Sequence, residues 1–214
     1  MAGTPEAAED LMMQVFTPAT KRSAEEVKDM QAYVDARNGG FKIAPWDYYY
    51  YAEKVKKEKF NFDEADVRPY FELNNVVNGM FYVAERLFGI KFIKMPDAPK
   101  YMEEVTVYDV VDAKGEHVAV FMTDFFPRAS KRQGAWMEQM QSAGLYADGM
   151  KRPIVYNVCN FTRPTADTPA LLTLDEVETA FHEFGHALQG MLTQAKYKSL
   201  AGTNVDRDYV ELCS

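Results

Sequence analysis

The sequence has little cysteine and no long apolar run, and both absences exclude classes of protein. Its two cysteines, Cys159 and Cys213, lie far apart and form no Cys-x-x-Cys pair, so no disulfide framework is expected and a reducing compartment is favoured. No run approaches the roughly 18 apolar residues of a membrane span. Residues 1–6 lack the basic and apolar regions of a secretory signal. We therefore expect a cytoplasmic protein with no membrane partner.

The sequence also lacks an excess of positive charge. Its 24 Lys and Arg residues are outnumbered by 32 Asp and Glu residues, which gives a net charge of −8. This balance argues against nucleic acid as a partner. Hydrophobic residues make up 47% of the 214 residues, enough for the core of one domain or of an incomplete part of a larger one.

Histidine is rare as well, but two of the three histidines form one motif. Residues 182–186 read His-Glu-Phe-Gly-His. On a helix, His182 and His186 lie one turn apart on the same face, so both imidazoles can bind one metal ion. Glu183 lies beside that ion and can act as general base for a bound water. Two neutral imidazoles, a carboxylate and an open position for water suit one Zn²⁺ ion.

The residues before this motif predict the helix that it requires. Thr173 and Glu176 have the spacing of a capping box, and Leu172 with Val177 can form a hydrophobic staple. Apolar residues then recur at helical spacing at 177, 180, 181, 184, 188 and 191. A buried helix with two structural histidines is the alternative interpretation.

A catalytic zinc ion needs a third protein ligand, and the sequence leaves several candidates. Gln189 and Leu192 occupy the positions where a metzincin has Gly and His. The remaining candidates downstream are Asp206, Asp208, Glu211 and Cys213.

A second helix is expected in this downstream segment. Residues 201–203 predict a turn, and Thr203 with Asp206 resembles a second N-cap, so that Glu211 would lie about two turns into the helix. Asp208 is then either a partner in the second coordination shell of a ligating histidine or a solvated carboxylate at the helix start.

The motif at 182–186 is followed by Ala-Gly-Thr-Asn-Val-Asp-Arg-Asp-Tyr-Val-Glu-Leu-Cys-Ser at 201–214. Together with the upstream residues 45–51, 67–73, 125–128 and 131–136, these segments resemble the thimet oligopeptidase and peptidyl-dipeptidase Dcp family of zinc metallopeptidases. The resemblance covers essentially the whole chain. Cys213 is a departure, because the family has Pro at this position.

The resemblance implies a zincin-like catalytic region in which Glu211 is the third zinc ligand and Glu183 the general base. It implies oligopeptide substrates and favours the peptidyl-dipeptidase branch, which removes C-terminal dipeptides. The alternatives are an oligopeptide endopeptidase of the same family, or a truncated fragment that binds zinc without turnover. Because family members run to several hundred residues, we expect a fragment that is incomplete at both ends.

The periodicities predict an α+β fold that is mainly helical with a small sheet. We expect one catalytic domain with a helical scaffold at 1–89, a small sheet and loops at 90–165, and zinc-site helices at 171–214. Strands are predicted at 91–95, 104–111, 116–125 and 154–161, whereas 126–148 reads as irregular.

The last predicted strand is a candidate for substrate binding. Val155, Asn157, Cys159 and Phe161 share one of its faces. Zinc peptidases of this type commonly pair a strand edge with the substrate backbone, so we assign Asn157 and Cys159, or the preceding hairpin, to substrate binding. An interior strand without ligand contact is the alternative.

Overall fold

The chain divides into two compact units in a computed structural model that describes residues 3–214. The units are Met1–Asp66 and Val67–Ser214. The sequence predicts that a helical scaffold ends, and the sheet region begins, near residue 89. This limit falls inside the second unit, because the helix that ends just before residue 89 packs on the sheet. No described helix is both long enough and apolar enough to cross a membrane.

The first unit consists of two helices and their connection. Helix α1 (Pro5–Asp35) runs through Pro18 without interruption and ends before Asn38, which has a positive φ. A short 3₁₀ helix, η1 (Pro45–Asp47), leads into α2 (Tyr48–Phe60). Tyr48 of α2 donates a hydrogen bond to Glu26 of α1 at 2.7 Å. Both helices lie within residues 1–89, where the sequence predicts a helical scaffold.

The second unit contains the sheet and its covering helices. After α3 (Glu64–Val67), its helices are η2 (Arg68–Tyr70), α4 (Leu73–Phe88), α5 (Leu174–Leu192), η3 (Lys198–Leu200) and η4 (Val210–Leu212). Its strands are β1 (Lys91–Lys94), β2 (Thr106–Val111), β3 (His117–Asp124), β4 (Trp136–Gln141), β5 (Gly144–Tyr146), β6 (Gly149–Lys151) and β7 (Ile154–Val158). The mixture of helices and a small sheet confirms the predicted α+β class.

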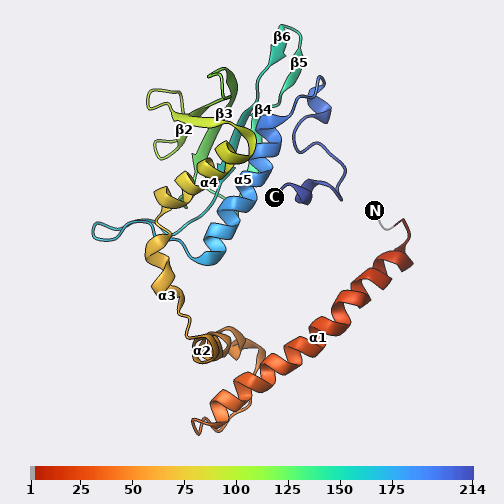
Figure 1. The fold of residues 1–214 in the computed structure, drawn as a ribbon, viewed down its shortest axis with the longest axis vertical. Coiled ribbons are helices and arrows are strands. Elements are labelled where there is room, and N and C mark those ends of the chain that lie inside the picture. The colour runs from red at the N-terminus through yellow and green to blue at the C-terminus, as the bar shows by residue number, and fades with distance from the viewer. Residues whose placement is uncertain (1–2) are drawn as a thin grey trace. The chain divides into compact units, whose positions relative to one another are not determined.

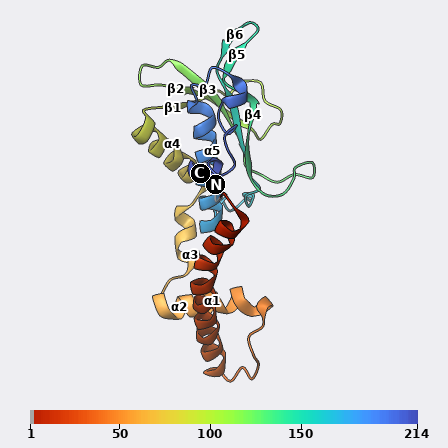
Figure 2. The ribbon, with the colours of Figure 1, turned by 90° about the vertical axis from the view of Figure 1, so that its right-hand side faces the viewer.

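Five strands form one mixed sheet in the order β1-β2-β3-β7-β4. Strands β3 and β7 pair in parallel, and all other neighbours are antiparallel. Strand β7 therefore lies inside the sheet, and β4 is an edge strand. Strands β5 and β6 form a separate hairpin that projects from the end of the sheet (Figure 2).

Helices α4 and α5 cover one face of the sheet (Figure 1). Four phenylalanines join these layers, and their ring centroids lie 4.0–6.3 Å apart: Phe81 of α4, Phe92 of β1, Phe121 of β3 and Phe184 of α5. Aromatic pairs at these separations add to the stabilisation from buried area. Because Phe184 lies within the His-Glu-Phe-Gly-His motif, the core holds that motif against the sheet.

The prediction that residues 126–148 are irregular was wrong, because β4 and β5 lie within them. The β4 sequence, Trp-Met-Glu-Gln-Met-Gln, contains no β-branched residue, so it carries only a weak strand signal. Its strand conformation comes from pairing with β7 rather than from local preference.

A buried ion pair closes the end of the sheet at which β3 and β7 both terminate. The side chains of Asp124 and Lys131 are 1% and 2% exposed, and the carboxylate lies 2.9 Å from the ammonium nitrogen. Arg128 and Tyr101 also donate hydrogen bonds to this carboxylate. Burial alone would raise the pKa of Asp124, but the hydrogen bonds from Lys131, Arg128 and Tyr101 outweigh burial and hold the pKa below its usual value.

We expect this ion pair to make stability fall in acid. The folded-state pKa of Asp124 lies below the unfolded value of 3.8, so its stabilisation is complete above that value and is lost as pH falls through the folded pKa. Urea unfolding should give an Asp124→Asn variant that is less stable by about 3–5 kcal/mol at pH 6, because Lys131 stays buried without its charged partner.

The difference between wild type and Asp124→Asn should shrink as the pH is lowered from 6 to 2.5. A difference that stays constant over this range would contradict the assignment, because other carboxylates contribute equally to both proteins.

Candidate functional site

Helix α5 begins at the expected cap. Thr173 Oγ1 accepts a hydrogen bond from the Glu176 backbone N–H at 3.1 Å, and the Glu176 carboxylate accepts one from the Thr173 N–H at 2.9 Å. This capping box is the one predicted from the sequence. The cap fixes where the helix starts and therefore which residues face the sheet.

The two histidines lie on the side of α5 that faces away from its buried residues. Ala180, Phe184 and Ala187 are buried against the sheet, whereas the side chains of His182 and His186 are 44% and 12% exposed. The two imidazole rings are edge to face, with centroids 4.8 Å apart. The spacing of four residues thus presents both rings to one place, as predicted.

Glu211 is the carboxylate that reaches the two histidines. Its Oε2 lies 3.4 Å from Nε2 of His182 and 3.2 Å from Nε2 of His186. Among the residues that the structure describes, these three form a group whose ligand atoms all lie within 4.8 Å of one another. Asp206, Asp208 and Cys213 are not part of this group.

The second helix expected around Glu211 is not formed. Residues 206–212 instead make successive turns with i→i+3 hydrogen bonds, from Tyr209 N–H to the Asp206 carbonyl and from Leu212 N–H to the Tyr209 carbonyl. Only the 3₁₀ helix η4 results. A segment this short gains too few i→i+4 bonds to offset the cost of nucleating an α-helix.

The segment that carries Glu211 is held against α5 at Gly185. A Cβ atom built on Gly185 would lie 2.3 Å from the Cys213 carbonyl oxygen and 2.7 Å from the Ser214 Cα. The missing side chain therefore permits the direct contact between the helix and this segment. Ser214, which the sequence interpretation missed, donates a hydrogen bond to Glu211 Oε2 at 3.1 Å.

Glu183 lies beside the three-residue group and is nearly buried. Its residue is 7% exposed. Burial raises the pKa of its carboxyl above the usual range, while the neighbouring His182 and His186 and a backbone hydrogen bond from Met137 of β4 act in the opposite direction. A carboxylate with a raised pKa is a stronger proton acceptor than an ordinary surface glutamate.

The two residues assigned to substrate binding lie in the interior. Asn157 is 1% exposed, and its side-chain amide donates a hydrogen bond of 2.6 Å to the backbone carbonyl of Glu183. Cys159 is fully buried, and burial raises the pKa of its thiol to about 12. Neither side chain is accessible to a ligand, so the structure gives Asn157 a role in holding α5 and Cys159 a role in packing.

The strand edge that is available near the site belongs to β4, not to the strand favoured from the sequence. Strand β7 has neighbours on both sides. Ala135, Trp136 and Met137 line a cavity of about 380 Å³ together with His182, Glu183 and His186. Thr203, Arg207, Val210 and Glu211 complete its lining.

The donor set fits a zinc ion. Ligand atoms about 2.0–2.1 Å from a tetrahedral zinc ion lie about 3.3 Å apart, and the two nitrogen–oxygen separations here are 3.2 and 3.4 Å. Nδ1 of His186 is buried without a hydrogen-bond partner, so the second-shell contact expected of Asp208 is not made to this atom. Asp208 itself lies on the exposed turn before Glu211.

Comparison with known proteins assigns this arrangement to a family. The model of peptidase family M3 matches residues 1–214. The chain belongs to peptidase family M3. The resemblance drawn from the motifs is therefore confirmed over the whole chain.

Proteins named as dipeptidyl carboxypeptidases and proteins named as oligopeptidases are both similar to this chain. It is 46% identical to dipeptidyl carboxypeptidase from Escherichia coli over 100% of its own length and 31% of that protein. It is 37% identical to oligopeptidase A from Salmonella typhimurium, over 100% of its length and 32% of that protein. A thimet-like oligopeptidase from Dictyostelium discoideum is 34% identical to the chain, over 95% of the chain's length and 32% of that protein. The chain thus spans about a third of the length of these M3 peptidases.

We expect a Gly185→Ala substitution to displace the Glu211 segment. A helix-interior Gly→Ala change normally stabilises by about 1 kcal/mol, but here the added Cβ would overlap the Cys213 carbonyl. Gly79→Ala in α4 is the matched control, because nothing lies within 4 Å of its added Cβ.

Thermal unfolding should show stabilisation by Gly79→Ala and none by Gly185→Ala. Titration with Zn²⁺ should show weaker binding for Gly185→Ala alone. Equal stabilisation by both changes, with unchanged metal binding, would contradict the close contact.

Proposed function

We propose that the chain carries the metal centre of a zinc-dependent peptidase that hydrolyses short peptides and removes C-terminal dipeptides. The observation that supports this most directly is the convergence of His182, His186 and Glu211 beside the buried Glu183, in a chain of peptidase family M3. The preference for dipeptide removal rests on identity: two dipeptidyl carboxypeptidases are 46% and 43% identical to the chain, and three oligopeptidases A are 34–37% identical.

His182, His186 and Glu211 would hold the zinc ion, and Ser214 orients the Glu211 carboxylate through its hydrogen bond. When bound at such a site, zinc lowers the pKa of its water towards about 7 and polarises the scissile carbonyl. The backbone of Gly185, packed on residues 213 and 214, keeps Glu211 facing the histidines. Asp208 remains a candidate for a second-shell role.

Glu183 acts as the general base and then as the general acid. Its carboxylate accepts a proton from the attacking water and transfers it to the leaving amine. Burial raises its pKa, which favours the first transfer. Asn157 holds the Glu183 backbone from the strand side.

The peptide would lie along the free edge of β4. An extended peptide can add to a sheet edge through main-chain hydrogen bonds, and pockets for alternate side chains then give specificity. Strand β4 has one neighbour only, and its first residues line the cavity that contains Glu183. This placement replaces the assignment of Asn157 and Cys159 to substrate contact.

The second candidate within the family is an oligopeptide endopeptidase, which the similarity to oligopeptidase A and thimet-like oligopeptidase supports. A third is a zinc-binding region that needs further residues for turnover, since the chain spans about a third of its relatives. The three candidates share the metal centre and differ in the products formed.

Zinc binding tests the metal centre by itself. We expect one Zn²⁺ per chain and a loss of affinity greater than 100-fold for Glu211→Ala, because a direct ligand should matter more than the second-shell groups that typically contribute about 10–100-fold. Competition with a chromogenic chelator would measure both affinities. Asp208→Asn should lower the zinc affinity by about 10–100-fold, as expected for a second-shell group. Asp206→Asn, the matched control, should bind zinc as wild type does. Wild-type affinity in Glu211→Ala would refute the ligand assignment.

Product analysis tests the reaction. An N-terminally blocked octapeptide is incubated with zinc-loaded protein, with Glu183→Gln as the control, and the products are identified by mass spectrometry. Stepwise loss of C-terminal dipeptides supports the main proposal, and an internal cut supports the endopeptidase alternative. Because a general base typically contributes about 10²–10⁴-fold, Glu183→Gln should be slower by that factor while it still binds zinc. Intact peptide in both samples would rule out turnover by this chain.

A further inference from the structure

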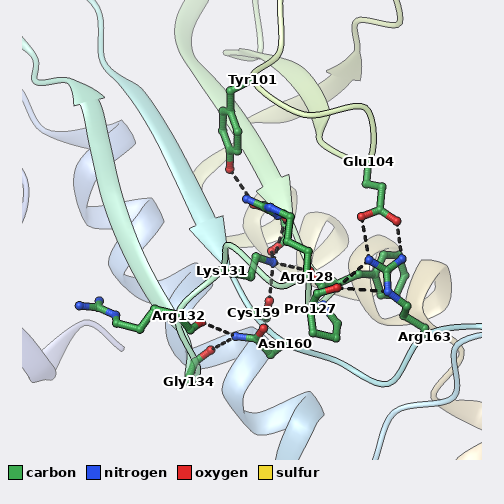
Figure 3. Close-up of polar contacts among 12 residues, drawn as sticks. Tyr101, Glu104, Pro127, Arg128, Lys131, Arg132, Gly134, Cys159, Asn160 and Arg163 are labelled. Carbon is green, nitrogen blue, oxygen red and sulfur yellow. Dashed lines mark hydrogen bonds and ion pairs between the residues drawn. The ribbon is translucent and has the colours of Figure 1, made fainter.

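Strand β4 reaches the site through an irregular loop, residues 125–135, that follows β3. As an edge strand, β4 is held by β7 on one side only. Its position at the site therefore depends strongly on how this loop is fixed. Two side chains, Lys131 and Asn160, make most of the polar contacts that fix it (Figure 3).

Lys131 fixes the middle of the loop. Its ammonium group donates hydrogen bonds to three backbone carbonyls, those of Asp124, Phe126 and Cys159, at 2.7–2.9 Å. These carbonyls come from the end of β3, from the loop and from the residue after β7. One buried cation thus ties the loop to both parallel strands, and its charge is neutralised by the Asp124 carboxylate.

Asn160 fixes the end of the loop, directly before β4 begins. Its side-chain amide nitrogen donates to the carbonyl of Arg132 at 3.0 Å and to the carbonyl of Gly134 at 2.7 Å. Gly134 has φ +90°, a conformation that glycine adopts at no steric cost. In Figure 3 these contacts lie next to one another, with the Asn160 amide between the two carbonyls.

The strand that follows lies beside the candidate base. Trp136 pairs with Val158 and Met137 with Asn157, and both Trp136 and Met137 line the cavity that contains Glu183. Asn157 in turn bonds to the Glu183 backbone carbonyl. A shift at the start of β4 would therefore move the wall of the cavity relative to Glu183, while the histidines on α5 and Glu211 would stay in place.

We propose that Asn160 is a positioning residue of the peptidase site, which acts by fixing the start of β4 and, through it, the cavity wall formed by Trp136 and Met137 beside Glu183. The proposal rests on the proposed function of Glu183. Lys131 supports the same loop, but its burial makes it part of the fold as well. The Asn160 side chain is half-buried, and the hydrogen bonds that it makes within the described part of the chain go to the two loop carbonyls, so its contribution can be separated from folding.

The test compares Asn160→Leu, which keeps the approximate shape and loses both donors, with the wild-type chain. Amide hydrogen exchange should become at least tenfold faster in β4, at residues 136–138, with no change in α5 or β2. Zinc affinity should stay within twofold of wild type, because no metal ligand lies on β4. With the octapeptide substrate, kcat should fall about tenfold.

Gln141→Met is the matched control. Gln141 also uses a side-chain amide to bond a backbone carbonyl, that of Arg152, but at the far end of β4. It should leave exchange at residues 136–138 and zinc affinity unchanged. If Asn160→Leu does not fold, Asn160→Asp, which keeps the size and polarity but cannot donate, takes its place.

Unchanged exchange at residues 136–138 in a folded Asn160 variant would overturn the proposal, as would faster exchange throughout the unit together with weaker zinc binding. The exchange and zinc measurements do not require turnover. If the wild-type chain cleaves no peptide, the proposed function fails by that result, and the exchange result still decides whether Asn160 positions β4.

Discussion

The packing of one face of α5 into the sheet determines where the three site residues on that helix lie. Phe184 enters the aromatic cluster with Phe81, Phe92 and Phe121, and this contact fixes the rotation of the helix. The residues on either side are then directed by helical geometry alone. His182 and His186 face away from the sheet, and Glu183 faces β4. The core thus positions three side chains that are not among its hydrophobic residues.

The features that the sequence predicts best are those set by residues close together in the chain. The cap at Thr173, the extent of α5 and the common direction of His182 and His186 all follow from spacing along one helix. Glu211 could be reached from the sequence only through resemblance, because its approach depends on tertiary contacts at Gly185. Strand β4 could not be predicted, since its conformation comes from pairing with β7. The second helix expected around Glu211 did not form, because the segment is too short to offset the cost of nucleating an α-helix.

The burial of Asn157 shows what cannot be predicted from the residues that share one face of a strand. The sequence correctly places Val155, Asn157 and Cys159 on one face of a strand, but the pattern does not say what that face meets. In the structure it meets α5. A polar residue in such a run is consistent with either a ligand contact or a buried hydrogen bond, and here it satisfies a backbone carbonyl of the helix. Membership of family M3 gives the chemistry of the motif but does not distinguish these two roles.

The parallel pairing of β3 and β7 has a consequence for the order of folding. Parallel neighbours need a long crossover, and here residues 125–153 between them include β4 and the β5–β6 hairpin. Among the described strands, β4 pairs within the main sheet only with β7, so it reaches the sheet together with β7 or after it. Contacts so distant in sequence form slowly. The antiparallel run β1-β2-β3 therefore consists of local pairings, whereas the cavity wall that faces Glu183 depends on the distant pairing of β7 with β3.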